Sequence, residues 1–358
     1  MPSSAVRRQA FSPIAGLLAL VTAAALLSSC SGSSRQAARP PAAPTSPVAR
    51  PSVPCTTVLS KAPSCTLLWG TSADGVPVTD LERAIGYRLQ IVYSFHGVDT
   101  GPLPTPQERA QARDGHILHI DLESRRFARA GHPAVRWSQV ADGTFDRELR
   151  QSALGLAKLD QPFFVTFDHE ADTPTKGRER GTAPEFVAAW RHVHALFAES
   201  GATKAIWAWT VTGYPANFAR AARLYPGNDD VDWVSWDPYD TRGCLADGVG
   251  TEAAQTFEDV ARPFYDWLQT AGVKAGISLA KPYLIGETGS AYDPKDPGAS
   301  AAFYRSIPAG LTRLPGIRAV TLWDERASAC DYRIAGVPEA ESALRAAARA
   351  TGQIRVYP

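Results

Sequence analysis

Three observations predict an α/β fold for this sequence, namely a single domain with the (β/α)8 or TIM barrel. Eight apolar segments of strand length recur along the chain, and helical segments lie between many of them. The third observation separates this fold from an open doubly wound sheet, which usually carries a G-x-G-x-x-G turn after its first strand. Here residues 70–75 read Gly-Thr-Ser-Ala-Asp-Gly, which does not fit that turn.

The strands are expected where apolar residues run nearly without interruption, as in strands that are buried on both faces. These segments are residues 66–71, 89–95, 116–122, 163–167, 205–211, 231–236, 283–286 and 319–323.

Helices are expected at residues 183–199, 257–271 and 339–350. The first has the clearest start, because Thr182 and Glu185 have the spacing of a capping box and Pro184 suits the first turn. The last would close the domain.

The first part of the chain is expected to lie outside the barrel. Arg7 and Arg8 precede an apolar run from Ile14 to Leu27, which is the layout of an export signal. The following Leu-Ser-Ser-Cys resembles a bacterial lipobox, in which Cys30 becomes the lipid-carrying N-terminus. We therefore predict a lipoprotein signal peptide at 1–29, a tether rich in Pro, Ala and Ser at 30–57, and the barrel domain at 58–358.

These features predict an extracytoplasmic protein, lipid-anchored to the cell membrane or secreted. The chain carries 37 Lys and Arg against 36 Asp and Glu, a net charge of +1. That balance disfavours a nucleic-acid surface or a polybasic membrane patch. Contact with the membrane is expected through the N-terminal lipid only, and the chain is expected to be a monomer.

The cysteine count agrees with export. Of five cysteines, Cys30 is assigned to the lipid, so four can pair in three possible ways. We favour Cys55–Cys65, which closes a short loop, and Cys244–Cys330, which would join two loops that flank the seventh strand. None of the spacings is a C-x-x-C metal pattern.

Two glutamates follow predicted strands at positions where barrels place their chemistry. Glu170 comes after the fourth strand and Glu287 after the seventh. These strands are nearly opposite in a barrel of eight, so the two carboxylates could face each other across the central cavity. Retaining glycoside hydrolysis needs two carboxyl groups roughly 5–5.5 Å apart.

Several motifs resemble one family of such enzymes. His169-Glu170 is similar to the acid/base pair of glycoside hydrolase family 26, known for β-1,4-mannanases and related β-glucanases and xylanases. Residues 231–239, Val-Asp-Trp-Val-Ser-Trp-Asp-Pro-Tyr, resemble that family's sixth strand, and residues 206–210 resemble its fifth. Trp323 matches an eighth-strand Trp of the family.

The resemblance implies a role for each matching residue. Glu170 would be the acid/base and Glu287 the nucleophile. His169 and Tyr239 would support the nucleophile, and Trp323 would be the platform for the sugar at the cleavage point. Residues 172–175, Asp-Thr-Pro-Thr, stand where mannanases usually carry an aromatic. The polysaccharide is therefore left open between β-mannan, β-glucan and related β-linked chains.

Two further residues are candidates for substrate contact. Asp237, at the end of the sixth strand, could bind sugar hydroxyls or cap its loop, and His96, at the end of the second strand, could reach the substrate. No cofactor or metal is expected, because residues 168–172 lack H-E-x-x-H and alternate between two faces.

The leading hypothesis is a retaining endo-β-glycosidase that works by double displacement with two glutamates. One alternative is a non-catalytic polysaccharide-binding lipoprotein on the same barrel. A weaker alternative is a metal-dependent hydrolase, which chelators would inhibit.

Overall fold

The computed structural model describes residues 66–72, 77–242, 244, 253–327 and 330–352. The predicted signal peptide, the tether, the lipid site at Cys30 and the Cys55–Cys65 bridge lie outside the described residues. They stay predictions.

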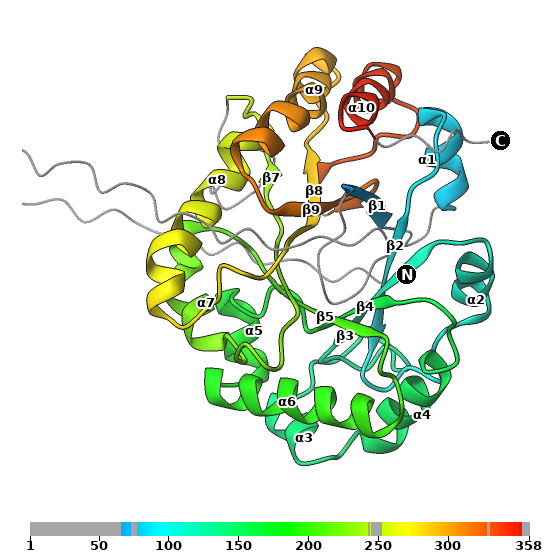
Figure 1. Ribbon diagram of the computed structural model, residues 1–358, viewed down its shortest axis with the longest axis vertical. Coiled ribbons are helices and arrows are strands. Elements are labelled where there is room, and N and C mark those ends of the chain that lie inside the picture. Colours follow the sequence, from blue (N-terminus) through cyan, green and yellow to red (C-terminus); the bar gives the residue numbers. More distant parts are fainter. Residues whose placement is uncertain (1–65, 73–76, 243, 245–252, 328–329, 353–358) are drawn as a thin grey trace, which may run out of the picture. The chain divides into compact units, whose positions relative to one another are not determined.

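The core of the fold is a closed barrel of eight parallel strands, as the sequence predicts (Figure 1). β1 pairs with both β2 and β9, which closes the ring, and β6 pairs directly with β8. The barrel strands are β1 (Leu68–Ser72), β2 (Ile91–Gly97), β3 (Ile117–Glu123), β4 (Phe163–Phe167), β5 (Ala205–Val211), β6 (Trp233–Trp236), β8 (Tyr283–Ser290) and β9 (Ile317–Leu322).

Helices surround the barrel (Figure 1). They are α1 (Val78–Ile85), α2 (Pro106–Arg113), α3 (Trp137–Ala141), α4 (Asp146–Leu156), α5 (Pro174–Arg180), α6 (Ala183–Glu199), α7 (Phe218–Leu224), α8 (Phe257–Trp267), α9 (Pro297–Arg313) and α10 (Pro338–Ala350). α6 has the predicted bounds, and Glu185 caps it by accepting a hydrogen bond from the Thr182 backbone N at 2.6 Å. Within the described part of the chain, no helix is long and apolar enough to cross a membrane.

The seventh barrel strand is longer than the sequence predicts. We expected it to end at residue 286, but β8 continues to Ser290 because the short strand β7 (Tyr239–Asp240) pairs with its last residues. Glu287 therefore lies within a strand rather than after one. A strand holds its backbone more firmly than a loop does.

The apolar interior forms two layers. One fills the barrel floor and includes Leu68, Phe164, Trp233 and Leu284. The other lies between the strands and the surrounding helices. Buried acidic side chains, among them Asp121, Asp237 and Glu287, lie toward the carboxyl ends of the strands, where barrels of this kind carry their sites.

Candidate active site

Glu287 is the buried acidic centre of this end of the barrel. Its side chain lies on β8, and the residue is 6% exposed. The Tyr239 hydroxyl donates a hydrogen bond to Glu287 Oε2 at 2.8 Å. Among the described residues, Glu287 Oε1 has no hydrogen-bond partner. One carboxylate oxygen is thus held in place by Tyr239, while the other has no such contact among the described residues.

The ionisation of Glu287 is set by its neighbours. Burial raises the pKa of the Glu287 carboxyl to about 7, the charge of His169 opposes this rise, and the charge of Glu170 adds to it. The hydrogen bond from Tyr239 also lowers the pKa of this carboxyl. The ionisation of Glu287 therefore depends on the charges of both His169 and Glu170.

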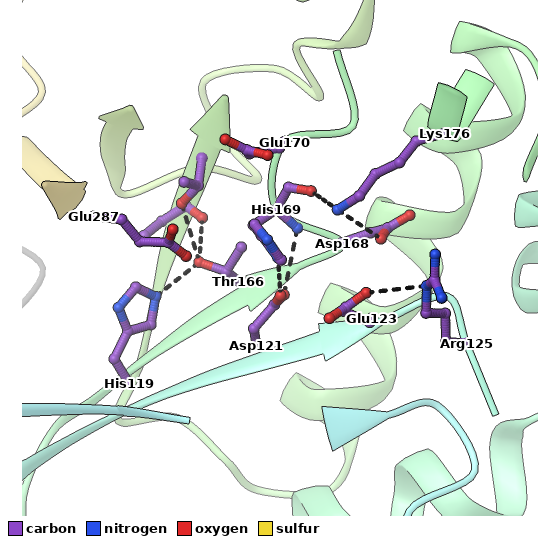
Figure 2. A network of polar contacts seen from close by, with 12 residues as sticks. His119, Asp121, Glu123, Arg125, Thr166, Asp168, His169, Glu170, Lys176 and Glu287 are labelled. Atoms are coloured by element: carbon purple, nitrogen blue, oxygen red, sulfur yellow. Dashed lines mark hydrogen bonds and ion pairs between the residues drawn. The ribbon is translucent and has the colours of Figure 1, made fainter. Parts of the chain in front are cut away.

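His169 is fixed by a carboxylate from the neighbouring strand (Figure 2). Asp121, on β3, is fully buried and accepts a short hydrogen bond from His169 Nδ1. Burial lowers the pKa of His169, but Asp121 and Glu287 outweigh this and raise it to about 9. The imidazole is therefore a cation at neutral pH.

Glu170 lies on the connection between β4 and α5, in a constrained backbone. Asp168 and Glu170 have φ values of 52° and 50°, which are unusual for residues with a side chain. Such conformations cost roughly 1–3 kcal/mol each and persist only where the surroundings hold them. The Glu170 backbone N donates to the Thr210 carbonyl at 3.1 Å, and this bond fixes the turn to β5.

The side chain of Asp168 fixes the backbone at residues 168–170 through contacts with α3 and α5. Trp137 Nε1 donates to Asp168 Oδ2 at 2.6 Å, and Arg180, from α5, forms a short buried ion pair with Asp168 Oδ1. Lys176 Nζ lies 3.6 Å from the same carboxylate. Three donors from α3 and α5 thus hold the residue that starts the strained segment.

An aromatic wall borders the site. Trp323 follows β9, is partly buried, and meets Phe95 edge-on with ring centroids 5.7 Å apart. Its backbone N donates to the Thr288 carbonyl at 2.9 Å, next to Glu287 in sequence. The position suits the sugar platform that the family resemblance implies.

The predicted bridge between Cys244 and Cys330 is present, with Cα atoms 5.3 Å apart. Both cysteines belong to a small apolar cluster with Tyr239, Trp323 and Tyr332. The rings of Tyr239 and Tyr332 are 4.7 Å apart. The disulfide therefore supports the tyrosine that binds Glu287.

Removing this disulfide should loosen the wall of the site. The bridge spans 86 residues, and for a loop of that length the expected loss of stability in C244S/C330S is about 2–4 kcal/mol. Urea unfolding followed by tryptophan fluorescence measures it. An unchanged midpoint would mean that the loops are held without the bridge.

Known proteins resemble this chain in part of the sequence and in the fold. None of the known family models matches the sequence. The β-1,3-xylanase TXYA of Vibrio sp. is 27% identical over 128 residues, which are 35% of this chain and 27% of that protein. Endoglucanase H of Acetivibrio thermocellus is 25% identical over 291 residues, 78% of this chain. The match covers 29% of that protein, so the chain spans less than a third of either relative.

Solved structures give the broader likeness. The catalytic domain of a Bacillus sp. JAMB-750 family 26 endo-β-1,4-mannanase has a TM-score of 0.58 and 15% identity, covering 80% of this chain and 90% of that one. A family 26 β-mannanase from Bacteroides ovatus has a TM-score of 0.60 and 14% identity, covering 80% and 89%. The chain shares the (β/α)8 barrel fold of these enzymes.

The structure brings five predicted residues to one end of the barrel. His169 and Glu170 follow β4, Tyr239 follows β6, Trp323 follows β9, and Glu287 lies in the carboxyl-terminal half of β8. Tyr239 and His169 each act directly on Glu287.

The prediction for His96 is not supported. His96 Nε2 lies 2.6 Å from Glu108 Oε1 on α2, so the ring faces the outer helix layer. Side chains alternate along a strand, and it is the preceding residue, Phe95, that meets His169 and Trp323.

Asp237, for which the sequence left sugar binding and loop capping open, is fully buried. A methyl group added at Gly286 would lie 2.5 Å from Asp237 Oδ1, so the carboxyl lies against the strand that carries Glu287. Burial, with the charge of Glu287, raises the pKa of Asp237 well above its usual range. Whether Asp237 contacts a sugar stays a prediction.

Asp121 is the functional residue that the sequence analysis missed. A signal for it exists: His119 and Asp121 alternate along the predicted strand 116–122, and Glu123 continues the pattern one residue beyond it. In the structure, Asp121 points into the barrel toward His169 (Figure 2).

Asp121, Glu123 and His169 are close enough together to suggest a metal site. Their charges are already compensated, however. Arg180 Nη2 lies 3.4 Å from Glu123 Oε2, and His169 is itself a cation. A divalent ion bound there would compete with the contacts that Arg180 makes with Glu123 and that His169 makes with Asp121.

Proposed function

We propose that this protein is a retaining endo-β-glycosidase that cleaves a β-linked polysaccharide by double displacement. The observation that carries the proposal is the burial of the Glu287 carboxylate and the contacts of its two oxygens. It is a buried carboxylate with one oxygen bound by Tyr239 and the other without a partner among the described residues, beside the charges of His169 and Glu170. This is what a nucleophile and its acid/base partner require.

In the first step, Glu287 Oε1 attacks the anomeric carbon of the sugar. Glu170 gives its proton to the glycosidic oxygen as the bond from that oxygen to the anomeric carbon breaks. A covalent glycosyl ester on Glu287 results, and the released chain end leaves with the proton.

In the second step, Glu170 takes a proton from water. The water oxygen bonds to the anomeric carbon, and the ester bond to Glu287 breaks. Two inversions at one carbon give net retention. Both glutamates end in their starting protonation states, so the cycle needs no cofactor.

The names of the similar proteins support a substrate class. Their names describe β-1,4-mannan, β-1,3-xylan and glucan cleavage. All are β-linked polysaccharides, and Trp323 with Phe95 supplies an aromatic surface for a sugar ring. β-Mannan, β-glucan or a related chain is the substrate we propose.

A hydrolysis screen tests this function. Purified protein is incubated with β-mannan, mixed-linkage β-glucan, β-1,3-xylan and bacterial exopolysaccharides, and new reducing ends are measured. Proton NMR of fresh products gives their anomeric configuration, which should be β. Binding without cleavage of any substrate would favour the polysaccharide-binding hypothesis, and initial α products would rule out double displacement.

The activity should depend on pH through Glu287. The nucleophile must be ionised, and burial raises the pKa of Glu287 to about 7. Activity is therefore present above that pH and lost as pH falls through it, by about tenfold per unit in kcat/KM. Initial rates between pH 5 and 9 check this; a rate constant that stays level down to pH 5 would contradict it.

Replacing Tyr239 by Phe should weaken the nucleophile. The hydroxyl binds the charged form of Glu287 at 2.8 Å and lowers its pKa. A hydrogen bond to a charged group contributes about 1.5–3 kcal/mol, so kcat/KM of Y239F should fall about 10- to 100-fold. Wild-type kinetics for Y239F would show that the contact is not used in the reaction.

We further propose that the enzyme is held on the extracytoplasmic side of the cell membrane by a lipid on Cys30. The lipobox-like Leu-Ser-Ser-Cys and the following Pro-rich tether support this. Metabolic labelling with a radioactive fatty acid should mark the wild type and not C30S. Equal labelling of both would place the lipid elsewhere.

A further inference from the structure

The carboxylate of Asp121 holds one residue at two points. Asp121 Oδ2 accepts from His169 Nδ1, and Asp121 Oδ1 accepts from the His169 backbone N at 3.4 Å. The same side chain therefore fixes both the ring and the main chain next to Glu170.

Packing leaves the ring little freedom. Phe95 meets the imidazole edge-on, with centroids 5.2 Å apart. Lys176 Nζ donates to the His169 carbonyl and so holds the main chain that carries the ring. Asp121 is fully buried, so water does not screen its charge from the ring.

We propose that Asp121 is a positioning residue that holds both the ring and the main chain of His169 beside Glu287 and thereby controls when this carboxylate can attack (Figure 2). Asp121 acts through His169, not on the substrate. The proposal rests on the function proposed above, because it assigns Glu287 the attacking role.

The charge on His169 depends on Asp121. Burial and Lys176 both lower the pKa of His169, and Asp121 is the foremost group that raises it, with Glu287 adding to the rise. Without Asp121, the two lowering effects should dominate and the ring should be neutral at pH 7. The groups that act electrostatically with His169 are Asp121, Glu123, His119, Lys176 and Glu287.

The effect on Glu287 has a definite sign. His169 lowers the pKa of Glu287 more than Asp121 raises it directly. Loss of Asp121 removes both effects, because the ring then loses its proton. The net result is a higher pKa for Glu287. The groups that act on Glu287 are His169, Glu170, Tyr239 and Asp121, together with buried Asp237 and Tyr93.

The first test does not depend on turnover. D121N keeps an oxygen that accepts from His169 Nδ1 but removes the charge. NMR of protein with labelled histidine and glutamate follows each titration, and the His169 signal is assigned by its loss in H169Q. The His169 midpoint should fall from about 9 to below 6.5. The midpoint of Glu287, assigned through E287Q, should rise.

The second test uses the pH–rate profile. In D121N, the acidic limb of kcat/KM should move to higher pH, with about a tenfold loss at pH 6 for each unit of movement and recovery toward alkaline pH. H169Q should move the limb in the same direction and at least as far, because Asp121 then keeps its charge near Glu287. D121N introduced into the H169Q background should move the limb no higher, since Asp121 then has no ring to act through.

D146N is the matched control. Asp146 accepts from His192 at 2.6 Å in the same type of pair, but this pair lies in the helix layer and both side chains are about one-third exposed. The pH–rate profile of D146N and the titration midpoint of Glu287 in this variant should equal those of the wild type.

The outcomes separate the two proposals. An unchanged His169 midpoint in D121N, or a Glu287 midpoint that does not rise when His169 loses its charge, overturns the positioning role. The same holds if D121N shifts the limb upward in the H169Q background. If D121N does not fold, H169Q alone decides, since a wild-type Glu287 midpoint in that variant overturns the proposal. Absence of hydrolysis by the wild type counts against the proposed function, while the NMR titrations still decide the role of Asp121.

Discussion

Glu287→Gln should lower kcat by at least about 10³-fold on any polysaccharide that the wild type cleaves. The amide cannot attack the anomeric carbon, whereas its size and the contact from Tyr239 are preserved. Because the substitution is nearly isosteric, the protein should fold and still bind polysaccharide. Reducing-end assays and affinity electrophoresis measure the two properties separately.

Glu170→Gln provides the matched comparison. Loss of the acid/base group should cost about 10²- to 10⁴-fold on polysaccharide. Aryl glycosides with acidic phenols need little protonation of the leaving group, so their first step should be nearly unaffected and the glycosyl–enzyme should accumulate. Mass spectrometry detects that ester. Cleavage by E287Q at the wild-type rate would refute the mechanism, as would an ester on a residue other than Glu287.

The second large effect is expected at the buried anchor beneath Glu170. Arg180 is fully buried between Asp168 and Glu123. Replacing it by Met leaves a buried carboxylate without its partner, which typically costs about 3–5 kcal/mol. R180M should therefore have a much lower urea midpoint. Its kcat should also fall, because the strained backbone at residues 168–170 loses its support.

Two controls isolate the cause. Arg83 pairs with Asp80 at 3.0 Å on the surface, where both side chains are largely exposed, so R83M should cost less than about 1 kcal/mol. In R180M/D168N, the stranded charge on Asp168 is also removed, and the loss should be smaller than in R180M alone. If R180M and R83M are equally stable, the buried pair is not an anchor.

Much of the fold could be predicted because its cause is local. The strand cores at residues 163–167 and 205–211 match to the residue, since buried apolar runs bounded by turns mark parallel strands. The seventh strand was predicted too short because its last residues pair with Tyr239 and Asp240, some fifty residues away in sequence. Periodicity within a segment carries no information about such a distant partner.

Part of the candidate site could also be predicted from local sequence patterns. Glu170 and Glu287 were found because strand ends are readable and because motifs such as His169-Glu170 resemble a known family. His96 was misplaced because a shift of one residue along a strand turns a side chain to the opposite face. Its neighbour Phe95 has the inward position instead.

The sequence by itself determined which strand carries each glutamate, and it indicated the pairing of Cys244 with Cys330. Only the tertiary structure decided that Asp121 holds a cationic His169 and that Asp237 is buried against Gly286. The physical reason is that ionisation depends on burial and on charges a few ångströms away. Those neighbours come from strands far apart in the chain and meet only when the barrel closes.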